Sequence, residues 1–160
     1  MIIKEITDTS DIDLLLSVVE SYPDNAKEIE AIKKQLLFEL SQAGDNRHIF
    51  ADFDEDKIVA FIQIILRNAD RDPDLANGKD MAHLHNLQVR SDLQGQGIGR
   101  QMMAFIEDKA KQMGKRILTL GVDSWNERAI RLYKGLGYEV FKEEPGRFPG
   151  EKGISMKKFL

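Results

Sequence analysis

The sequence predicts an α/β or α+β fold with a mixed central sheet of about six to seven strands and about four flanking helices. We expect residues 1–160 to form a single domain, because 160 residues suit one domain with a substantial core. Hydrophobic residues make up 42% and charged residues 31%, which is ordinary for a globular protein. Apolar segments of strand and helix periodicity follow one another along the chain, without an internal repeat or a long linker.

The first half of the chain predicts one strand, two helices and a hairpin. A weakly alternating strand covers residues 2–7, and Ser10 is the expected N-cap of the first helix. Apolar residues at helical spacing predict the second helix over residues 29–40. Two β-branched runs, 48–53 and 58–66, are joined by a short polar turn and therefore predict a hairpin.

The second half alternates strands and helices after a polar loop over residues 67–80. The expected elements are a strand over 83–89, a helix over 98–113, a strand over 117–121, a helix over 125–134, and strands over 138–141 and 153–159. Strand–helix alternation of this kind favours helices packed around one sheet.

A glycine-rich turn joins the predicted strand 83–89 to the following helix. Its sequence is Gln94, Gly95, Gln96, Gly97, Ile98, Gly99 and Arg100. Glycine tolerates positive φ and lets the backbone approach a ligand closely. The first N–H groups of a helix lack intrahelical partners and carry partial positive charge. The turn is therefore a candidate site for a phosphate or pyrophosphate.

The spacing of these glycines shows which of three known glycine motifs the turn fits. The dinucleotide fingerprint G-x-G-x-x-G needs a third glycine where this chain has Arg100 or Met102. The nucleotide P-loop needs a Lys-Ser/Thr pair, which does not follow here. The pattern that fits is Q-x-x-G-x-G, at Gln94, Gly97 and Gly99. A glycine-rich loop without a ligand is the alternative.

This pattern resembles the acetyl-CoA pyrophosphate turn of the GNAT superfamily of N-acetyltransferases. A second segment resembles the family signature N-x-x-A-x-x-L-Y-x-x-x-G-[FY], at Asn126, Ala129, Leu132, Tyr133, Gly137 and Tyr138. The resemblance covers residues 48–160 closely. The first ~45 residues match only in their expected order of one strand and two helices. It implies a GNAT-like fold and direct acetyl transfer from acetyl-CoA to a primary amine in a ternary complex.

The strand before the turn reads H-L-H-x-L-x-V from His83, which is similar to serotonin-type (arylalkylamine) N-acetyltransferases. In that group the two histidines are implicated as the general base, acting through water. His83 and His85 are two apart, so a strand directs both to one face, together with Leu87 and Val89. A reference pKa of about 6.5 suits proton acceptance. Histidines bonded to the backbone are one alternative, and a metal site is a second that the lack of cysteine disfavours.

The resemblance also implies roles for residues on both sides of the turn. Tyr133 is the expected general acid for the departing thiolate, with a core tyrosine as the alternative. Main-chain groups of Leu87, Gln88 and Val89 are expected to bind the ligand and polarise the thioester carbonyl. The pyrophosphate is expected to meet the N–H groups of residues 95–100. Asn126 and Ala129 are the expected cofactor contacts of the second motif, with a helix N-cap as the alternative for Asn126.

The acceptor site is expected near loop 67–80, segment 143–153 and the N-terminal helices. Four aspartates of this loop can attract an ammonium group or form a solvated, mobile loop: Asp70, Asp72, Asp74 and Asp80. Trp125 and Phe148 can line a pocket, although packing roles are favoured. A small-molecule amine is favoured over a peptide N-terminus or a protein lysine as the acceptor.

Charge and composition exclude several classes of partner. The net charge of −4 gives no basic footprint for nucleic acid or anionic membrane. No apolar run approaches the ~20 residues of a membrane span, and the N-terminus lacks a signal-peptide pattern. The absence of cysteine excludes disulfides, thiolate metal ligands and a cysteine nucleophile. We therefore expect a cytoplasmic enzyme without a metal, and a homodimer is the common default for soluble oligomers.

Two rival functions remain open at this point. A non-catalytic acyl-CoA-binding sensor or regulatory module would keep the glycine turn but would not need His83, His85 or Tyr133. A nucleotide-dependent enzyme could use the same glycines, although the motif spacings are against it.

Overall fold

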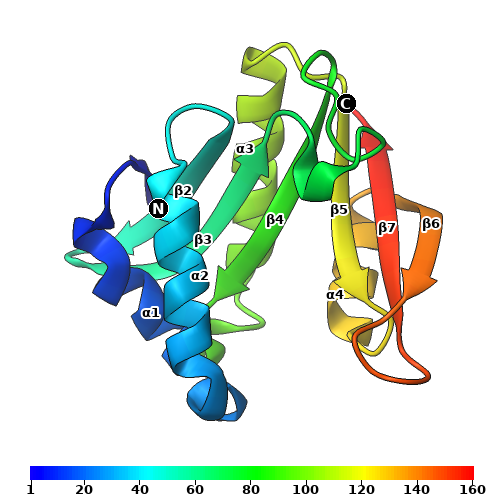
Figure 1. Ribbon diagram of the computed structural model, residues 1–160. Helices are drawn as coiled ribbons and strands as arrows, with labels where there is room; N and C mark the ends of the chain where they lie inside the picture. Colours follow the sequence, from blue (N-terminus) through cyan, green and yellow to red (C-terminus); the bar gives the residue numbers. More distant parts are fainter. The chain divides into compact units, whose positions relative to one another are not determined.

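The computed structural model describes residues 1–160 apart from the side chain of Asp70. Its elements are β1 (Ile2–Ile6), α1 (Ile12–Glu20), α2 (Ile29–Ser41), β2 (Arg47–Asp54), β3 (Lys57–Ile65), β4 (Met81–Val89), α3 (Ile98–Gln112), β5 (Ile117–Asp123), α4 (Glu127–Gly135), β6 (Glu139–Pro145) and β7 (Lys152–Phe159) (Figure 1). The strands form a seven-stranded sheet in the order β1-β2-β3-β4-β5-β7-β6. The sheet is mixed, because β4 pairs with β5 in parallel whereas β7 pairs antiparallel with β5 and β6. The predicted mixed sheet with four helices is confirmed.

The chain groups into two compact units. The first unit comprises Met1–Ile64 and Asn86–Ile106, and the second comprises Ile65–His85 and Glu107–Leu160. The glycine turn therefore belongs to the first unit, and His83, His85 and Tyr133 belong to the second.

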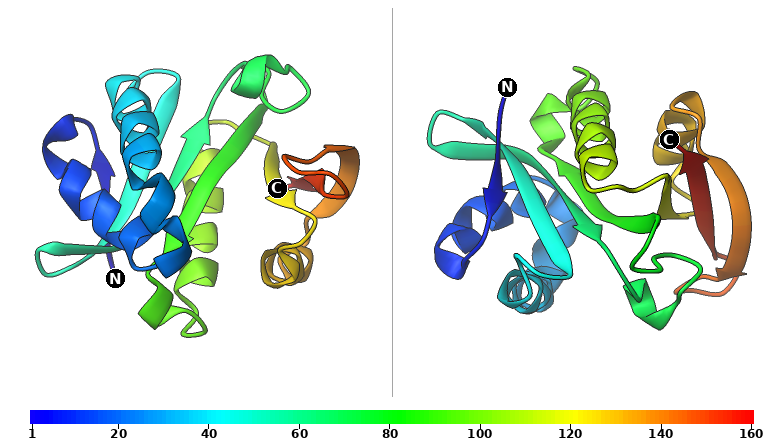
Figure 2. Two further views of the ribbon diagram at one scale, coloured as in Figure 1. Left: turned by 60° about the horizontal axis from the view of Figure 1, so that its bottom comes forward. Right: turned by 90° about the horizontal axis from the view of Figure 1, so that it is seen from above.

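In the first unit, the alternation of β2 supplies side chains to both faces of the strand. Ile49 and Ala51 join a buried cluster with α1 residues such as Leu15. Phe50, which lies between them, makes an edge-to-face contact with Phe105 of α3, with ring centroids 5.3 Å apart. The right-hand view of Figure 2 shows α1 and α2 on one side of β2 and β3, and α3 on the other. The two-residue period of a strand accounts for this division of the core.

The second unit is built on the antiparallel strands β5, β7 and β6. The β5–β7 ladder runs from Ile117↔Phe159 to Asp123↔Gly153. Met81–Leu84 of β4 pair in parallel with Ile117–Leu120 of β5, which places His83 directly opposite Thr119. This register brings a β4 histidine and a β5 hydroxyl together.

The start of α1 differs from the prediction. Ser10 is not its N-cap: the Ser10 N–H donates to the Asp8 carboxylate at 2.7 Å, and a short 3₁₀ turn covers Thr9–Asp11 before α1 begins at Ile12. An aspartate that accepts from the N–H two residues on forms a local turn of its own. This turn occupies the segment in which the sequence predicts the first helical residues.

Candidate active site

The glycine turn has the backbone geometry that an anion-binding helix start requires. Gly95 and Gly97 have φ of 82° and 85°, in the left-handed region that favours glycine. The Gln101 N–H donates to the Gly97 carbonyl at 3.1 Å, which marks the beginning of the α3 hydrogen-bond ladder. The N–H groups of residues 97–100 precede this ladder and have no intrahelical acceptor. The turn is exposed from Gln94 to Gly97 and can therefore present these donors to a ligand.

The Gln94 side chain is held by a residue that sequence reasoning missed. Gln94 Nε2 donates to the Tyr22 hydroxyl, and that hydroxyl donates to the Val89 carbonyl. Ser21, next to Tyr22, accepts from the Ser91 N–H at 2.9 Å. The segment after α1 therefore forms hydrogen bonds with both ends of the connection between β4 and the glycine turn. A cofactor contact by Gln94 stays a prediction.

Strand β4 contains a left-handed residue between the histidines and the turn. Asn86 has φ of 58°, and its side-chain oxygen accepts from Gln88 Nε2 at 2.8 Å. A left-handed residue inside a strand interrupts the regular alternation of side chains. The alternation argument therefore places His83 and His85 on one face, but it does not extend past Asn86 to Leu87 and Val89. The prediction that all four residues share that face is therefore not supported for Leu87 and Val89.

His83 is buried, with 4% of its surface exposed, whereas His85 is half-buried. His83 Nδ1 lies 2.8 Å from Thr119 Oγ1, and Thr119 Oγ1 lies 2.7 Å from the Leu75 carbonyl oxygen. One nitrogen of the His83 ring therefore contacts a side chain. No sequence signal pointed to Thr119, because its proximity depends on the β4–β5 register.

Tyr133 lies on α4 with its side chain buried, beside the ring of Tyr138 at a centroid distance of 6.1 Å. Burial raises the pKa of Tyr133 to about 12, since the phenolate loses hydration inside the protein. The phenol is therefore protonated at neutral pH and can donate a proton or a hydrogen bond. Both readings of Tyr133, as a core residue and as an acid, are compatible with this environment.

The raised pKa of Tyr133 makes a testable prediction about alkaline stability. The unfolded value is 10.0 and the folded value is about 12, so the folded state retains this proton across that interval. The stabilisation is complete below pH 10 and is lost as the pH rises towards 12, by about 2–3 kcal/mol. Urea unfolding should show that wild-type protein loses more stability over this interval than Tyr133→Phe. Equal losses in both proteins would contradict the burial of the phenol.

Asn126 caps α4. Its side-chain oxygen accepts from the Ala129 N–H at 3.2 Å, and its own N–H donates to the Asp123 carbonyl at 2.9 Å. The structure therefore shows the capping role that the sequence analysis gave as the alternative for Asn126. Contacts of Asn126 and Ala129 with a cofactor stay predictions.

Loop 67–80 is anchored by contacts that a merely solvated loop would not make. Asp72 pairs with Lys142 of β6 at 2.6 Å, and this hydrogen bond holds the pKa of Asp72 below and that of Lys142 above its ordinary value. Leu75 and Ala76 are buried in a cluster against which Phe141 packs. Asp72 therefore already has a cationic partner within the chain.

The other aspartates of this loop differ in their surroundings. Asp80 accepts from Asn77 Nδ2 at 2.8 Å, which lowers its pKa. Asp74 is exposed, and the side chain of Asp70 lies outside the described part of the structure. Attraction of an ammonium acceptor by these residues stays a prediction.

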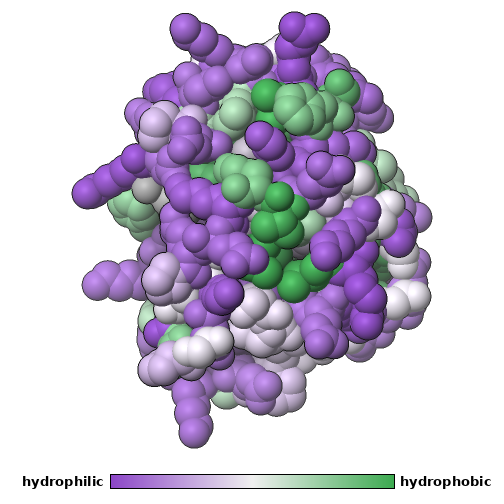
Figure 3. All heavy atoms as spheres, turned by 90° about the vertical axis from the view of Figure 1, so that its right-hand side faces the viewer, coloured by the Kyte–Doolittle hydropathy of each residue, from purple (hydrophilic) through white to green (hydrophobic). Residues whose placement is uncertain are grey.

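Trp125 and Phe148 do not have the packing roles that the sequence analysis favoured. Their exposed fractions are 63% and 57%. Apolar residues contribute much of any folded protein's surface, so hydrophobicity alone does not predict burial. Figure 3 shows the side of the molecule on which β6 and β7 lie: it is mainly hydrophilic, with small separate apolar areas.

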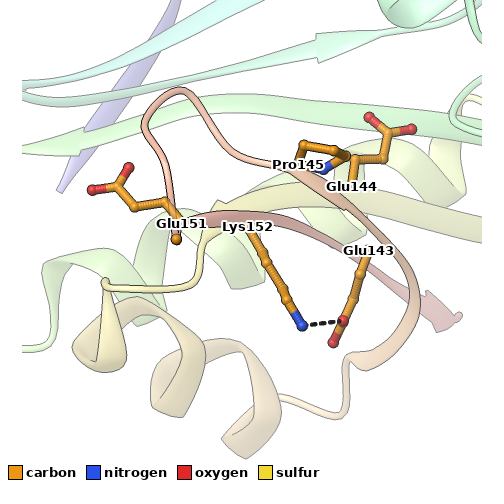
Figure 4. Close-up of a pocket in the computed structure, with 6 residues that line it drawn as sticks. Glu143, Glu144, Pro145, Glu151 and Lys152 are labelled. Atoms are coloured by element: carbon orange, nitrogen blue, oxygen red, sulfur yellow. Dashed lines mark hydrogen bonds and ion pairs between the residues drawn. The ribbon is translucent and has the colours of Figure 1, made fainter.

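An open depression of about 380 Å³ lies at the β6–β7 hairpin, within the segment expected to shape the acceptor site. Its lining residues are Glu143, Glu144, Pro145, Gly150, Glu151 and Lys152. Lys152 points towards Glu143, with Nζ 3.5 Å from the carboxylate, whereas Glu144 and Glu151 point away from this pair (Figure 4). Neither the histidines nor Tyr133 line it, so we regard it as a peripheral acidic surface and not as the reaction centre.

Two further features of the described residues bear on the expected ligands. Their histidines and acidic side chains form no cluster of three or more that could hold a metal ion. None of the helices in the part of the chain described here is both long and apolar enough to cross a bilayer.

Comparison with known proteins identifies a family match that spans most of the chain. The sequence model described as "Acetyltransferase (GNAT) family" matches residues 14–138. L-amino acid N-acyltransferase MnaT of Escherichia coli (strain K12) is 33% identical over 61 residues, which are 38% of this chain and 36% of that protein. The chain therefore matches only about a third of this relative's length.

Solved structures share the fold over nearly the whole chain. The ribosomal-protein-S18-alanine N-acetyltransferase from Escherichia coli has a TM-score of 0.72 at 22% identity, covering 98% of this chain and 92% of that one. An aminoglycoside 6′-N-acetyltransferase complexed with coenzyme A has a TM-score of 0.71 at 20% identity, with coverage of 99% and 97%. At these identities the likeness establishes the fold alone.

Proposed function

Because the chain belongs to the GNAT acetyltransferase family, we propose that it transfers an acetyl group from acetyl-CoA to a primary amine. In this reaction the amine nitrogen forms a bond to the thioester carbonyl carbon, the C–S bond breaks, and coenzyme A leaves as a thiol. The amine must lose a proton and the departing sulfur must gain one. Direct attack in a ternary complex suits a chain that has no cysteine to carry an acyl group.

The observation that carries this proposal is the glycine turn. Gly95 and Gly97 adopt positive φ where α3 begins, and the N–H groups at the start of this helix are suited to a pyrophosphate. In the proposed role, residues 95–100 hold the diphosphate through their main chain. Main-chain groups of Leu87, Gln88 and Val89 bind the pantetheine arm and polarise the carbonyl, and the left-handed Asn86 supports this role because it marks an irregular strand at that point.

The proposed general base lies on β4 and the proposed general acid on α4. His83 and His85 share one face of β4 and are the candidate general bases, because a neutral imidazole accepts a proton near neutral pH. Tyr133 donates a proton to the departing thiolate, since its buried phenol is protonated at neutral pH.

We propose a small cationic amine as the acceptor. The chain carries a net charge of −4, and the depression at the β6–β7 hairpin is lined by three glutamates and one lysine. An acidic surface raises the local concentration of ammonium compounds. MnaT, by its name, acts on L-amino acids, whereas a structural relative acts on a ribosomal protein, so both small molecules and peptides belong in a substrate panel.

The proposed activity predicts release of free CoA thiol only when acetyl-CoA and an amine are both present. The assay follows thiol release with a colorimetric reagent over a panel of amino acids, polyamines, aminoglycosides and peptides with a free N-terminus. Reactions without amine control for thioester hydrolysis. Tight calorimetric binding of acetyl-CoA with no turnover across the panel would instead support a binding module, and competition by ATP or NAD would support a nucleotide enzyme.

A further inference from the structure

His83, Thr119 and the Leu75 carbonyl form a hydrogen-bonded chain inside the second unit. His83 Nδ1 to Thr119 Oγ1 is 2.8 Å, and Thr119 Oγ1 to the Leu75 oxygen is 2.7 Å. His83 and Thr119 are both buried, at 4% and 0% exposure. Their strands pair them directly opposite each other, so the contact is fixed by the register of β4 and β5.

The direction of this chain follows from the number of available protons. A carbonyl oxygen can only accept, so the single hydroxyl proton of Thr119 goes to Leu75. Thr119 Oγ1 can then only accept from His83, which requires a proton on Nδ1. In a neutral imidazole the other nitrogen, Nε2, must then carry the lone pair.

We infer that Thr119 is a positioning residue that holds His83 in the Nδ1–H tautomer and thereby makes His83 Nε2 the basic nitrogen of the active site. This inference rests on the proposed acetyl transfer and selects between the two candidate histidines. When Nε2 accepts a proton, the Nδ1–H bond to Thr119 persists. An orienting hydrogen bond on the second ring nitrogen is a general means of fixing which nitrogen reacts.

The carbonyl that orients Thr119 is itself held in place. Leu75 is buried, and its N–H donates to the Asp72 carbonyl at 3.2 Å. The Asp72 carboxylate pairs with Lys142 at 2.6 Å and also interacts electrostatically with His83. An anionic Asp72 favours the imidazolium that forms when His83 takes up a proton. Loop 67–80 therefore contributes to the base through its backbone and through one ionised side chain.

The tautomer can be observed without any turnover. Long-range ¹H–¹⁵N correlation spectra of ¹⁵N-labelled protein distinguish a protonated from a bare ring nitrogen, and the chain has three histidines to assign. His48→Gln and His85→Gln assign the signals. At a pH at which the ring is neutral, His83 is expected to be protonated at Nδ1 in wild type and in Thr119→Ser. In Thr119→Val, which keeps the shape but removes the hydroxyl, this signature is expected to disappear.

The kinetic part of the test uses the same pair of variants. Thr119→Val is expected to lower kcat at least about tenfold, as a misoriented general base should, with the KM for acetyl-CoA unchanged. Thr119→Ser is expected to restore kcat to within about twofold of wild type. Circular dichroism checks that both variants fold.

Three results would overturn the inference: an Nε2–H tautomer in wild type, an unchanged His83 spectrum in Thr119→Val, or wild-type kcat in that variant. The wild-type spectrum needs no variant, so the inference stays falsifiable if Thr119→Val does not fold. A protein that transfers no acetyl group to any amine would contradict the proposed function instead, and the spectra would still decide whether Thr119 fixes the ring.

Discussion

Replacement of Tyr133 by phenylalanine is expected to lower kcat about 100-fold, the lower end of what general acid catalysis contributes. The phenol is buried, and its pKa of about 12 keeps it protonated at neutral pH, so that it can donate to the negative charge that develops on the departing sulfur. Without the hydroxyl, the sulfur must leave as an unprotonated thiolate. The KM for acetyl-CoA should change little, because the proposed main-chain contacts to the diphosphate remain. Steady-state kinetics with varied acetyl-CoA at saturating amine separate the two parameters.

Tyr138→Phe is the matched control for this prediction. The two rings are edge-to-face neighbours in the same unit, and the Tyr138 hydroxyl has no hydrogen-bond partner among the described residues. Removing a buried, unsatisfied hydroxyl should leave activity unchanged and should maintain or increase the free energy of unfolding, by up to about 1–3 kcal/mol. Equal kcat values in Tyr133→Phe and wild type would assign Tyr133 to the core alone.

Gly97→Ala is expected to weaken acetyl-CoA binding by about 10-fold or more, through two effects. At φ of 85° an L-residue is strained by about 1–2 kcal/mol relative to glycine, so the turn would relax away from its present shape. The added Cβ would also enter a space in which no described atom beyond the adjoining backbone lies within 4 Å, where we place the diphosphate. Isothermal titration with acetyl-CoA measures the change in Kd directly.

Gly114→Ala separates backbone strain from the loss of the binding site. Gly114 follows the end of α3, has φ of 80°, and is likewise surrounded by open space. The two variants should therefore lose similar stability, about 1–2 kcal/mol each. Only Gly97→Ala should raise the Kd for acetyl-CoA. Unchanged affinity in that variant would show that the glycine turn does not bind the cofactor.

Features that depend on local chemistry were predictable from the sequence. The hairpin strands were expected at 48–53 and 58–66 and lie at Arg47–Asp54 and Lys57–Ile65, because the period of apolar residues is a property of the segment itself. The helix after the glycine turn begins at Ile98 as expected. Positive φ at Gly95 and Gly97 also agrees with a turn that needs glycine. The predicted start of α1 was wrong, because Asp8 forms a local turn with Ser10 in place of the first helical turn.

Burial and long-range partners were not predictable in the same way. Trp125 and Phe148 are exposed although both are strongly apolar, since the exposure of a side chain depends on what the rest of the chain places over it. The left-handed conformation of Asn86 interrupts the alternation expected for β4. Asparagine tolerates positive φ better than most residues, but its presence in a strand does not by itself predict that conformation.

The sequence by itself determined the family motifs, the period of each element and the glycine turn, because each depends on residues within a short stretch of chain. Only the tertiary structure decided that Tyr22 holds Gln94, 72 residues away, and that Thr119 lies between His83 and Leu75, at separations of 36 and 44 residues. A hydrogen bond forms between atoms within about 3 Å, and strand register sets which distant atoms reach that distance. The sequence therefore predicted the chemical types of the reactive groups. The tautomer and orientation of His83 depend instead on the pairing of β4 with β5.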